Sequence, residues 1–113
     1  MSREHRRINR FGFAEYEDMI ELSRETDGPE LARVLSSIVE RVLSEESGLL
    51  ETLSDGAQAD FVVPLGMAAR MLSSGGYSAM ELVSAAAAVR YCAEPHRTEF
   101  PDDLARMLSR LPR

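Results

Sequence analysis

The strongest pattern in this 113-residue chain is an aliphatic stripe between residues 31 and 43. Its members recur at spacings of three and four residues, and arginine, serine and glutamate occupy most positions between them. This period places all of the aliphatic side chains on one side of an α-helix. Such a helix is stable when its stripe is covered, so the pattern predicts a protein core or a dimer interface. The stripe consists of Leu31, Val34, Leu35, Ile38, Val39, Val42 and Leu43.

The rest of the chain is also typical of helices, because no stretch alternates with the period of a β-strand. Ser78 and Glu81 have the spacing of a capping box, which predicts the start of a helix. Pro64 is compatible with the first turn of a helix and would kink it at any later position. We expect helices at about 14–25, 29–46, 61–73, 78–92 and 101–111, with 49–53 either extending the second helix or forming a separate turn.

The composition favours a thin helical core. Aromatic residues make up only 6% of the chain and tryptophan is absent, so aliphatic side chains and methionine must fill the interior. Small helical cores often gain buried surface by dimerisation. We therefore expect an all-α fold: a small bundle of about five helices with one long central helix, forming a homodimer. Residues 11–113 form the single domain, and residues 1–10 form a flexible basic arm.

The charge distribution argues against nucleic-acid binding. Residues 1–10 carry a net charge of +3, residues 11–60 carry −10 and residues 61–113 carry +1, which sum to the total of −6. A DNA-binding surface needs arginine or lysine directed at phosphates, and the acidic body lacks that excess. The arm, with Arg3, Arg6, Arg7 and Arg10, could contact RNA, an anionic surface or the acidic body, or have no role.

Two features predict a cytoplasmic location. The single cysteine excludes an intrachain disulfide, as expected in a reducing compartment. The longest apolar stretch, residues 61–69, is about half the length of a membrane span and contains a proline. We expect no contact with a membrane.

Cys92 and His96 are the best candidates for metal or nucleophile chemistry. Their spacing of four residues could place two ligands on one helical face, but Pro95 interrupts that face and the only other histidine is His5. As a nucleophile and base, they lack an orienting third residue. We interpret Cys92 as a core thiol and His96 as a loop residue, and we expect no cofactor.

Other catalytic and DNA-binding patterns are incomplete. Gly75-Gly76 lacks the lysine and preceding strand of a phosphate-binding loop. Residues 61–91 resemble a helix-turn-helix in spacing, but the second helix would present alanine and methionine to the groove instead of arginine, asparagine or glutamine. Glu45-Glu46 and Asp102-Asp103 are interpreted as solvated helix ends. We expect the chain not to be an enzyme.

Apolar surface is the feature that remains. Ala85 to Ala88 would allow another helix to approach closely, and Met67, Met71, Met80 and Met107 would supply adaptable contacts. The first helix is too short to be stable unless it packs against something, which makes its apolar side a candidate partner face. The predicted partner-binding residues are Phe13, Tyr16, Met19 and Ile20. Replacing Ile20 by aspartate is expected to abolish partner binding without loss of helicity.

Three segments of the chain carry a resemblance to a known protein family. They are Arg6-Arg7-Ile8-Asn9-Arg10-Phe11-Gly12-Phe13, Asp27-Gly28-Pro29-Glu30 and Phe61-Val62-Val63-Pro64-Leu65. With these, the chain resembles over its whole length the QslA-like anti-activators of quorum sensing, a family of small pseudomonad proteins. The resemblance implies an all-helical dimer that binds the ligand-binding domain of a LuxR-type transcription factor such as LasR. By covering the dimerisation surface of that regulator, the protein would keep it off DNA.

Two other functions remain open from the residues alone. An acidic helical chaperone or escort would hold an exposed helix of an unrelated client protein. A small DNA-binding regulator would show salt-dependent binding to duplex DNA, which the net charge disfavours.

Overall fold

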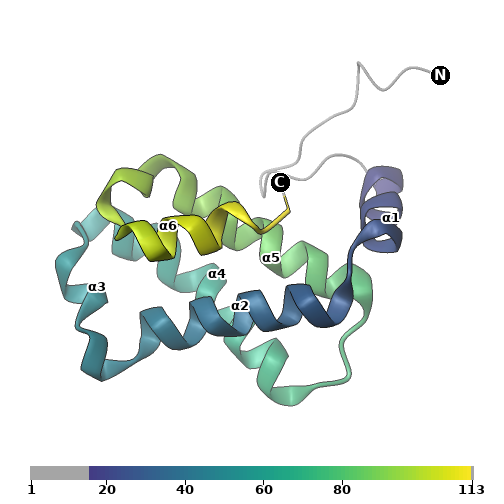
Figure 1. Ribbon diagram of the computed structural model, residues 1–113, viewed down its shortest axis with the longest axis horizontal. Coiled ribbons are helices and arrows are strands. Elements are labelled where there is room, and N and C mark those ends of the chain that lie inside the picture. Colours follow the sequence, from purple (N-terminus) through teal and green to yellow (C-terminus); the bar gives the residue numbers. More distant parts are fainter. Residues whose placement is uncertain (1–15, 113) are drawn as a thin grey trace.

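The computed structural model describes residues 16–112, without the side chains of residues 16–19 and 47. This part of the chain forms six α-helices and two 3₁₀ turns and contains no strand, which confirms the all-α class (Figure 1). The predicted arm, residues 1–10, lies outside the described residues. The elements are α1 (Tyr16–Glu25), α2 (Gly28–Leu43), η1 (Glu45–Ser47), α3 (Leu49–Thr52), α4 (Asp55–Ser74), α5 (Ala79–Ala93), η2 (Glu94–Glu99) and α6 (Asp102–Ser109).

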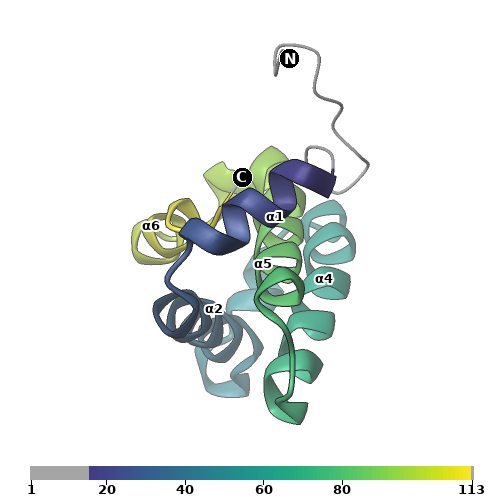
Figure 2. The ribbon, with the colours of Figure 1, turned by 90° about the vertical axis from the view of Figure 1, so that its right-hand side faces the viewer.

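An antiparallel pair, α4 and α5, organises the molecule (Figure 1). Helix α2 packs against both members of the pair, and α6 packs against α2 and α5. In the end-on view α2 and α6 lie on one side of α5, while α1 crosses the end of α5 (Figure 2). The four longest helices therefore meet at α5.

The core lies between the pair and α2. Its largest fully buried side chains come from four helices and from Leu111, which follows α6, and no polar side chain is buried among the described residues. The rings of Phe61 and Phe100 contact each other at a centroid distance of 5.1 Å and a tilt of 52°, which joins α4 to the segment before α6. The other fully buried large side chains are Leu35, Ile38, Val42, Leu65, Val83, Val89, Leu104 and Leu111.

The aliphatic stripe of α2 faces this core. Leu31, Val34, Leu35, Ile38 and Val42 are buried within the single chain, and Val39 is half-buried. Leu43, at the end of the helix, is 38% exposed. Most of the stripe is therefore covered by the other helices of the same chain.

Helix α2 is shorter than the predicted 29–46. It begins at Gly28, where the Asp27 carboxylate accepts a hydrogen bond of 3.1 Å from the amide of Glu30, and Pro29 lies in the first turn. It ends at Leu43 because Ser44 is extended, and the following residues form the 3₁₀ turn η1. Residues 49–53, left open by the sequence pattern, contain the separate helix α3.

Helix α4 begins six residues earlier than predicted, at Asp55. Ser54 is the N-cap: its hydroxyl oxygen accepts a hydrogen bond of 3.2 Å from the amide of Ala57. The Glu99 carboxylate accepts bonds from the Ser54 amide (2.7 Å) and hydroxyl (2.9 Å), which fastens this helix start to η2. Gly56 is accommodated in the first turn of the 20-residue helix, which is longer than the 16-residue α2.

This early start places Pro64 inside α4, so it does not begin the helix. Proline has no amide hydrogen to donate to the carbonyl of Asp60, one turn earlier, which weakens the helix locally. Pro64 itself is half-buried.

The predicted capping box of α5 is confirmed. The Ser78 amide donates to the Glu81 carboxylate (2.7 Å) and the Glu81 amide donates to the Ser78 hydroxyl oxygen (3.1 Å). The loop before it depends on glycine, since Gly75 and Gly76 have φ angles of 70° and 68°. This loop reverses the chain and sets α5 antiparallel to α4.

Candidate protein-interaction groove

An apolar groove of about 600 Å³ lies between α4 and α5. We call it the α4–α5 groove. Its walls come from both helices, and on α4 the lining residues are different from Phe61 and Leu65, which face the core. It is lined by Ala59, Asp60, Val63, Pro64, Met67, Met71, Glu81, Ser84, Ala85, Ala88 and Cys92.

The α4 wall carries the most exposed large apolar side chains of the described residues. Val63 is 63% exposed and Met67 is 66% exposed, one helical turn apart. Met71, a further turn along, is half-buried. Isolated apolar residues are common on protein surfaces, but a contiguous apolar row beside a groove is typical of a binding site.

The α5 wall is built from small side chains. Ala85 and Ala88 are half-buried, and Ser84 lies beside them. Small side chains let the backbone of a neighbouring segment approach closely. The run of alanines in the sequence predicted this close approach, and Met67 and Met71 predicted the adaptable surface.

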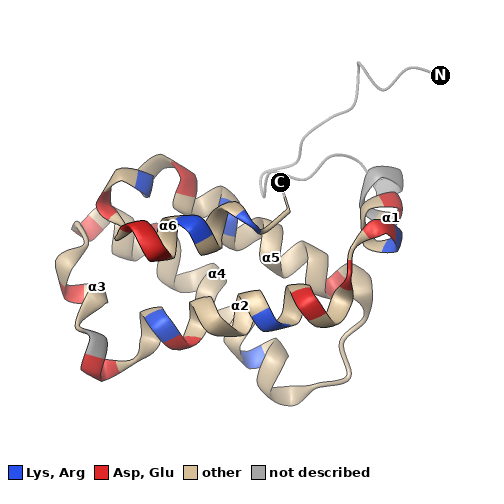
Figure 3. Cartoon of the chain, in the orientation of Figure 1, with Lys and Arg blue, Asp and Glu red and all other residues tan. Residues whose placement is uncertain are grey.

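The two ends of the groove are acidic. At one end Asp60, whose side chain is 59% exposed, lies 2.8 Å from His96 Nε2. At the other end Glu81 is exposed, and its carboxylate accepts a hydrogen bond from the Ser78 amide. Among the described lining residues there are two carboxylates and no arginine. Acidic residues also gather at both ends of the long axis of the molecule (Figure 3).

His96 has a fixed position that the sequence pattern did not predict. It lies in η2, with its ring 17% exposed between Asp60 of α4 and Glu99, whose Oε2 is 3.6 Å from His96 Nδ1. The interpretation of His96 as a loop residue missed this contact, because 36 positions separate it from Asp60. Within residues 16–112, no group of three histidine, cysteine or acidic side chains has an arrangement that could hold a metal ion.

Cys92 lies at the same end of the groove and is half-buried. Burial raises the pKa of its thiol, and the nearby charge of Asp60 raises it further. The thiol is therefore protonated at neutral pH and is a poor nucleophile.

None of the predicted partner-binding residues is among the described lining residues of the groove. Phe13 is outside the described residues, and Tyr16 and Met19 are in α1 but their side chains are outside the described set. Ile20 is half-buried, and α1 packs against α5. Val63 was not among the predicted site residues. The signal for it was the apolar run from Phe61 to Leu65, which places apolar residues on both sides of one helix.

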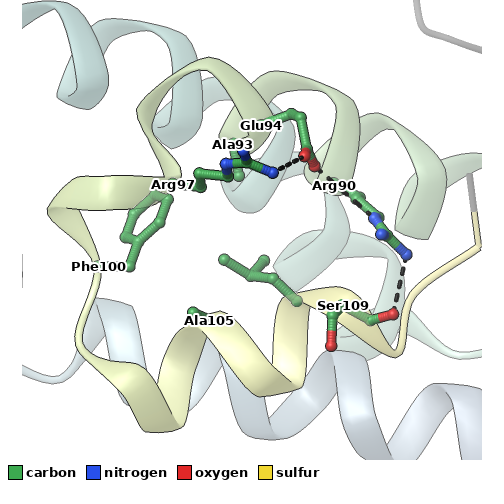
Figure 4. A pocket seen from close by; sticks show the side chains of 8 residues that line it. Arg90, Ala93, Glu94, Arg97, Phe100, Ala105 and Ser109 are labelled. Carbon is green, nitrogen blue, oxygen red and sulfur yellow. Dashed lines mark hydrogen bonds and ion pairs between the residues drawn. The ribbon is translucent and has the colours of Figure 1, made fainter.

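A second, smaller pocket of about 170 Å³ lies between the end of α5 and α6 (Figure 4). Arg90 donates hydrogen bonds from Nη1 to the carbonyls of Ser109 (2.9 Å) and Leu111 (2.7 Å), and its Nε is 3.9 Å from Glu94. Arg97 pairs with the same glutamate at 3.3 Å. The Arg90 contacts bind the end of α6 and the residues after it to α5, so we interpret this pocket as structural.

A third pocket, of about 340 Å³, lies where α2 meets the C-terminal segment. Glu30 pairs there with Arg33 (2.6 Å) and Arg110 (2.7 Å). The Arg33 hydrogen bonds are the main cause that lowers the pKa of Glu30. These exposed pairs contribute little to stability.

Comparisons of this chain with known protein families, with curated proteins and with solved structures find no match. Within the part of the chain that the structure describes, none of the helices combines the length and apolar character needed to cross a membrane.

Proposed function

We propose that this chain is a protein-binding negative regulator. It sequesters a LuxR-type quorum-sensing transcription factor by covering the dimerisation surface of the regulator, and so prevents DNA binding. In this proposal the chain acts without a cofactor, as a homodimer in the cytoplasm. The partner surface is the α4–α5 groove.

The observation that carries the proposal is the uncovered apolar row on α4. Val63 and Met67 are each more than 60% exposed, and they line the groove together with Ala85 and Ala88 of α5. Burying these side chains against a partner would be favourable by about 25 cal/mol for each Å² of apolar surface removed from water. An amphipathic helix lying in an apolar groove is a common mode of protein recognition.

The choice of partner is supported by the resemblance to the QslA-like anti-activators. A regulator that dimerises through apolar helices exposes those helices when it is monomeric, and a groove that accepts a helix can compete for them. Occlusion of this kind needs shape and apolar surface, and methionine side chains adapt to the surface that they meet.

Co-expression with the ligand-binding domain of a LuxR-type regulator tests the proposal. Size-exclusion chromatography with light scattering should show one complex, with a mass that contains a single copy of the regulator domain. This protein alone should have the mass of a dimer.

Two matched variants of α4 locate the surface. Met67→Asp should abolish co-elution, because it buries a charge in the interface. Ser73→Asp introduces the same charge on the same helix, at an exposed position outside the groove lining, and should leave co-elution unchanged. Circular dichroism should show the same helicity for both variants.

Ile20→Asp distinguishes the groove from the face of α1. If Ile20→Asp prevented co-elution while Met67→Asp did not, the partner face would be on α1 and the groove assignment would be wrong. Separate peaks for this protein and the regulator domain would contradict the regulator proposal. In that case, a stable complex with an unrelated client protein would favour an escort function.

A further inference from the structure

The two acidic ends of the α4–α5 groove lie at a defined separation. Along α4, Asp60 and Met71 are 11 positions apart, and along α5 so are Glu81 and Cys92. The helices are antiparallel (Figure 1). Asp60 is close enough to Cys92 for its charge to act on the thiol, so these two residues share one end of the groove, and Met71 and Glu81 share the other. Since an α-helix rises 1.5 Å per residue, the backbone positions of Asp60 and Glu81 lie about 16 Å apart along the groove.

Both carboxylates are anchored and still accessible. The contact with His96 holds Asp60, whose side chain remains 59% exposed. The capping box holds Glu81, which is also exposed. A partner cation that pairs with a carboxylate already fixed in place loses less conformational freedom than one that must order both side chains.

We infer that the occupant of the groove is an amphipathic partner helix with an arginine or lysine at each end of its apolar stripe, 11 positions apart. This inference rests on the proposed protein-binding function. Eleven residues are about three turns, and positions i and i+11 lie within about 20° of each other around a helix. The apolar positions of the partner helix between its two cations are i+3, i+4, i+7 and i+8. These positions contact Val63 and Met67 of α4 and the alanines Ala85 and Ala88 of α5.

Charge complementarity favours this occupant over an acidic or neutral helix. The groove has an apolar middle and a carboxylate at each end, and no basic side chain among its described lining residues. Opposite charges at the rim of an interface fix the register of the partner and speed its association. An acidic helix would bring like charges together at both ends.

The test uses the full chain and two synthetic peptides of 15 residues, measured by fluorescence polarisation. The probe peptide has arginines at its second and thirteenth positions, leucines at its fifth, sixth, ninth and tenth, and alanine or glutamine elsewhere. The control peptide has the same composition with its arginines at the fourth and eleventh positions, on the opposite side of the helix. The probe should bind at least fivefold more tightly than the control at low salt.

A charge-only variant isolates the electrostatic part of the inference. Glutamine can replace glutamate in a capping box, so Glu81→Gln removes the charge and keeps the start of α5. We expect Glu81→Gln to weaken probe binding about two- to fivefold, as for an exposed ion pair, and to leave control binding unchanged. Met67→Asp should abolish binding of both peptides, and Ser73→Asp should change neither.

Equal binding of the two peptides, or no effect of Glu81→Gln, would overturn the inference. A dimer of the full chain that Met67→Asp converts to a monomer would also overturn it, since a second copy would then occupy the groove.

If Phe11→Ser or Phe13→Ser bound the probe more tightly than the wild type, the N-terminal segment of the chain would be competing with the probe for the groove. That segment would then be the occupant, and the inference would be overturned. Probe binding without co-elution of a LuxR-type domain would support this inference and contradict the regulator proposal alone, whereas the reverse result would contradict this inference alone.

Discussion

Both sides of the α4–α5 pair carry apolar side chains, but the environments of these side chains differ. On the inner side, Phe61, Leu65 and Ala68 are fully buried against α2 and the segment before α6. On the outer side, Val63 and Met67 are apolar residues of the same helix and remain mostly exposed. The first set is covered by the chain itself, and the second set is available to another protein.

This difference shows that apolar character alone does not identify a core residue. A helix that is apolar on both sides carries more apolar surface than one neighbouring helix can cover. In this chain α2 covers one side of the pair, so stability should depend on the inner side and binding on the outer side.

The largest effect should come from a pair of substitutions two positions apart on α4. Leu65→Ala should lower the free energy of unfolding by about 2–5 kcal/mol, because it leaves a cavity in the core. Met67→Ala should change it by less than about 0.5 kcal/mol. Chemical denaturation of both variants measures the contrast, and equal losses would show that the outer side is also covered.

The hydrogen bonds from Arg90 to the carbonyls of Ser109 and Leu111 test how much the contact between α5 and α6 contributes to stability. Arg90→Ala removes two hydrogen bonds from a charged donor to the end of α6, and should cost about 1.5 kcal/mol. Arg97→Ala is the control, since its side chain is 73% exposed and should contribute less than about 0.5 kcal/mol. Thermal denaturation that ranks these two variants in the opposite order would remove the structural role assigned to Arg90.

The capping box at the start of α5 should affect both the stability of the fold and the binding of a partner in the groove. Ser78→Ala removes the hydroxyl oxygen that accepts from the Glu81 amide, and should lower stability by about 1 kcal/mol. Because the fraying would reach Glu81, probe peptide binding should weaken as well. A loss of stability with no change in peptide affinity would show that Glu81 does not contact the partner.

The smallest effect concerns the start of α4 and depends on pH. Hydrogen bonds from the Ser54 amide and hydroxyl lower the pKa of Glu99 from its ordinary value of 4.5. The ionised carboxylate therefore stabilises the folded state above pH 4.5, and this contribution is lost as the pH falls through the lowered pKa. Glu99→Gln should be less stable than the wild type at pH 7, and the difference should shrink as the pH falls to 3. A difference that is independent of pH would assign the role of Glu99 to packing.

The sequence pattern predicted several features of the fold because they depend on neighbouring residues. The period of the α2 stripe and the Ser78–Glu81 capping box each depend on residues a few positions apart. The candidate site was predicted only in part. Its alanines and methionines were noticed, but the chosen partner face was α1, since a short helix beside a basic arm gave the clearer pattern.

Local chemistry along the chain decides that this protein is helical, where most of its helices begin and end, and that its apolar surface exceeds one narrow stripe. The tertiary structure fastens the start of α4 to η2, through a Glu99 contact with Ser54 that spans 45 positions. It likewise joins His96 to Asp60 and decides which side of α4 and α5 faces α2. Helical period assigns residues to sides of a helix, but which side becomes core depends on where the other helices pack, and that choice has no local signature.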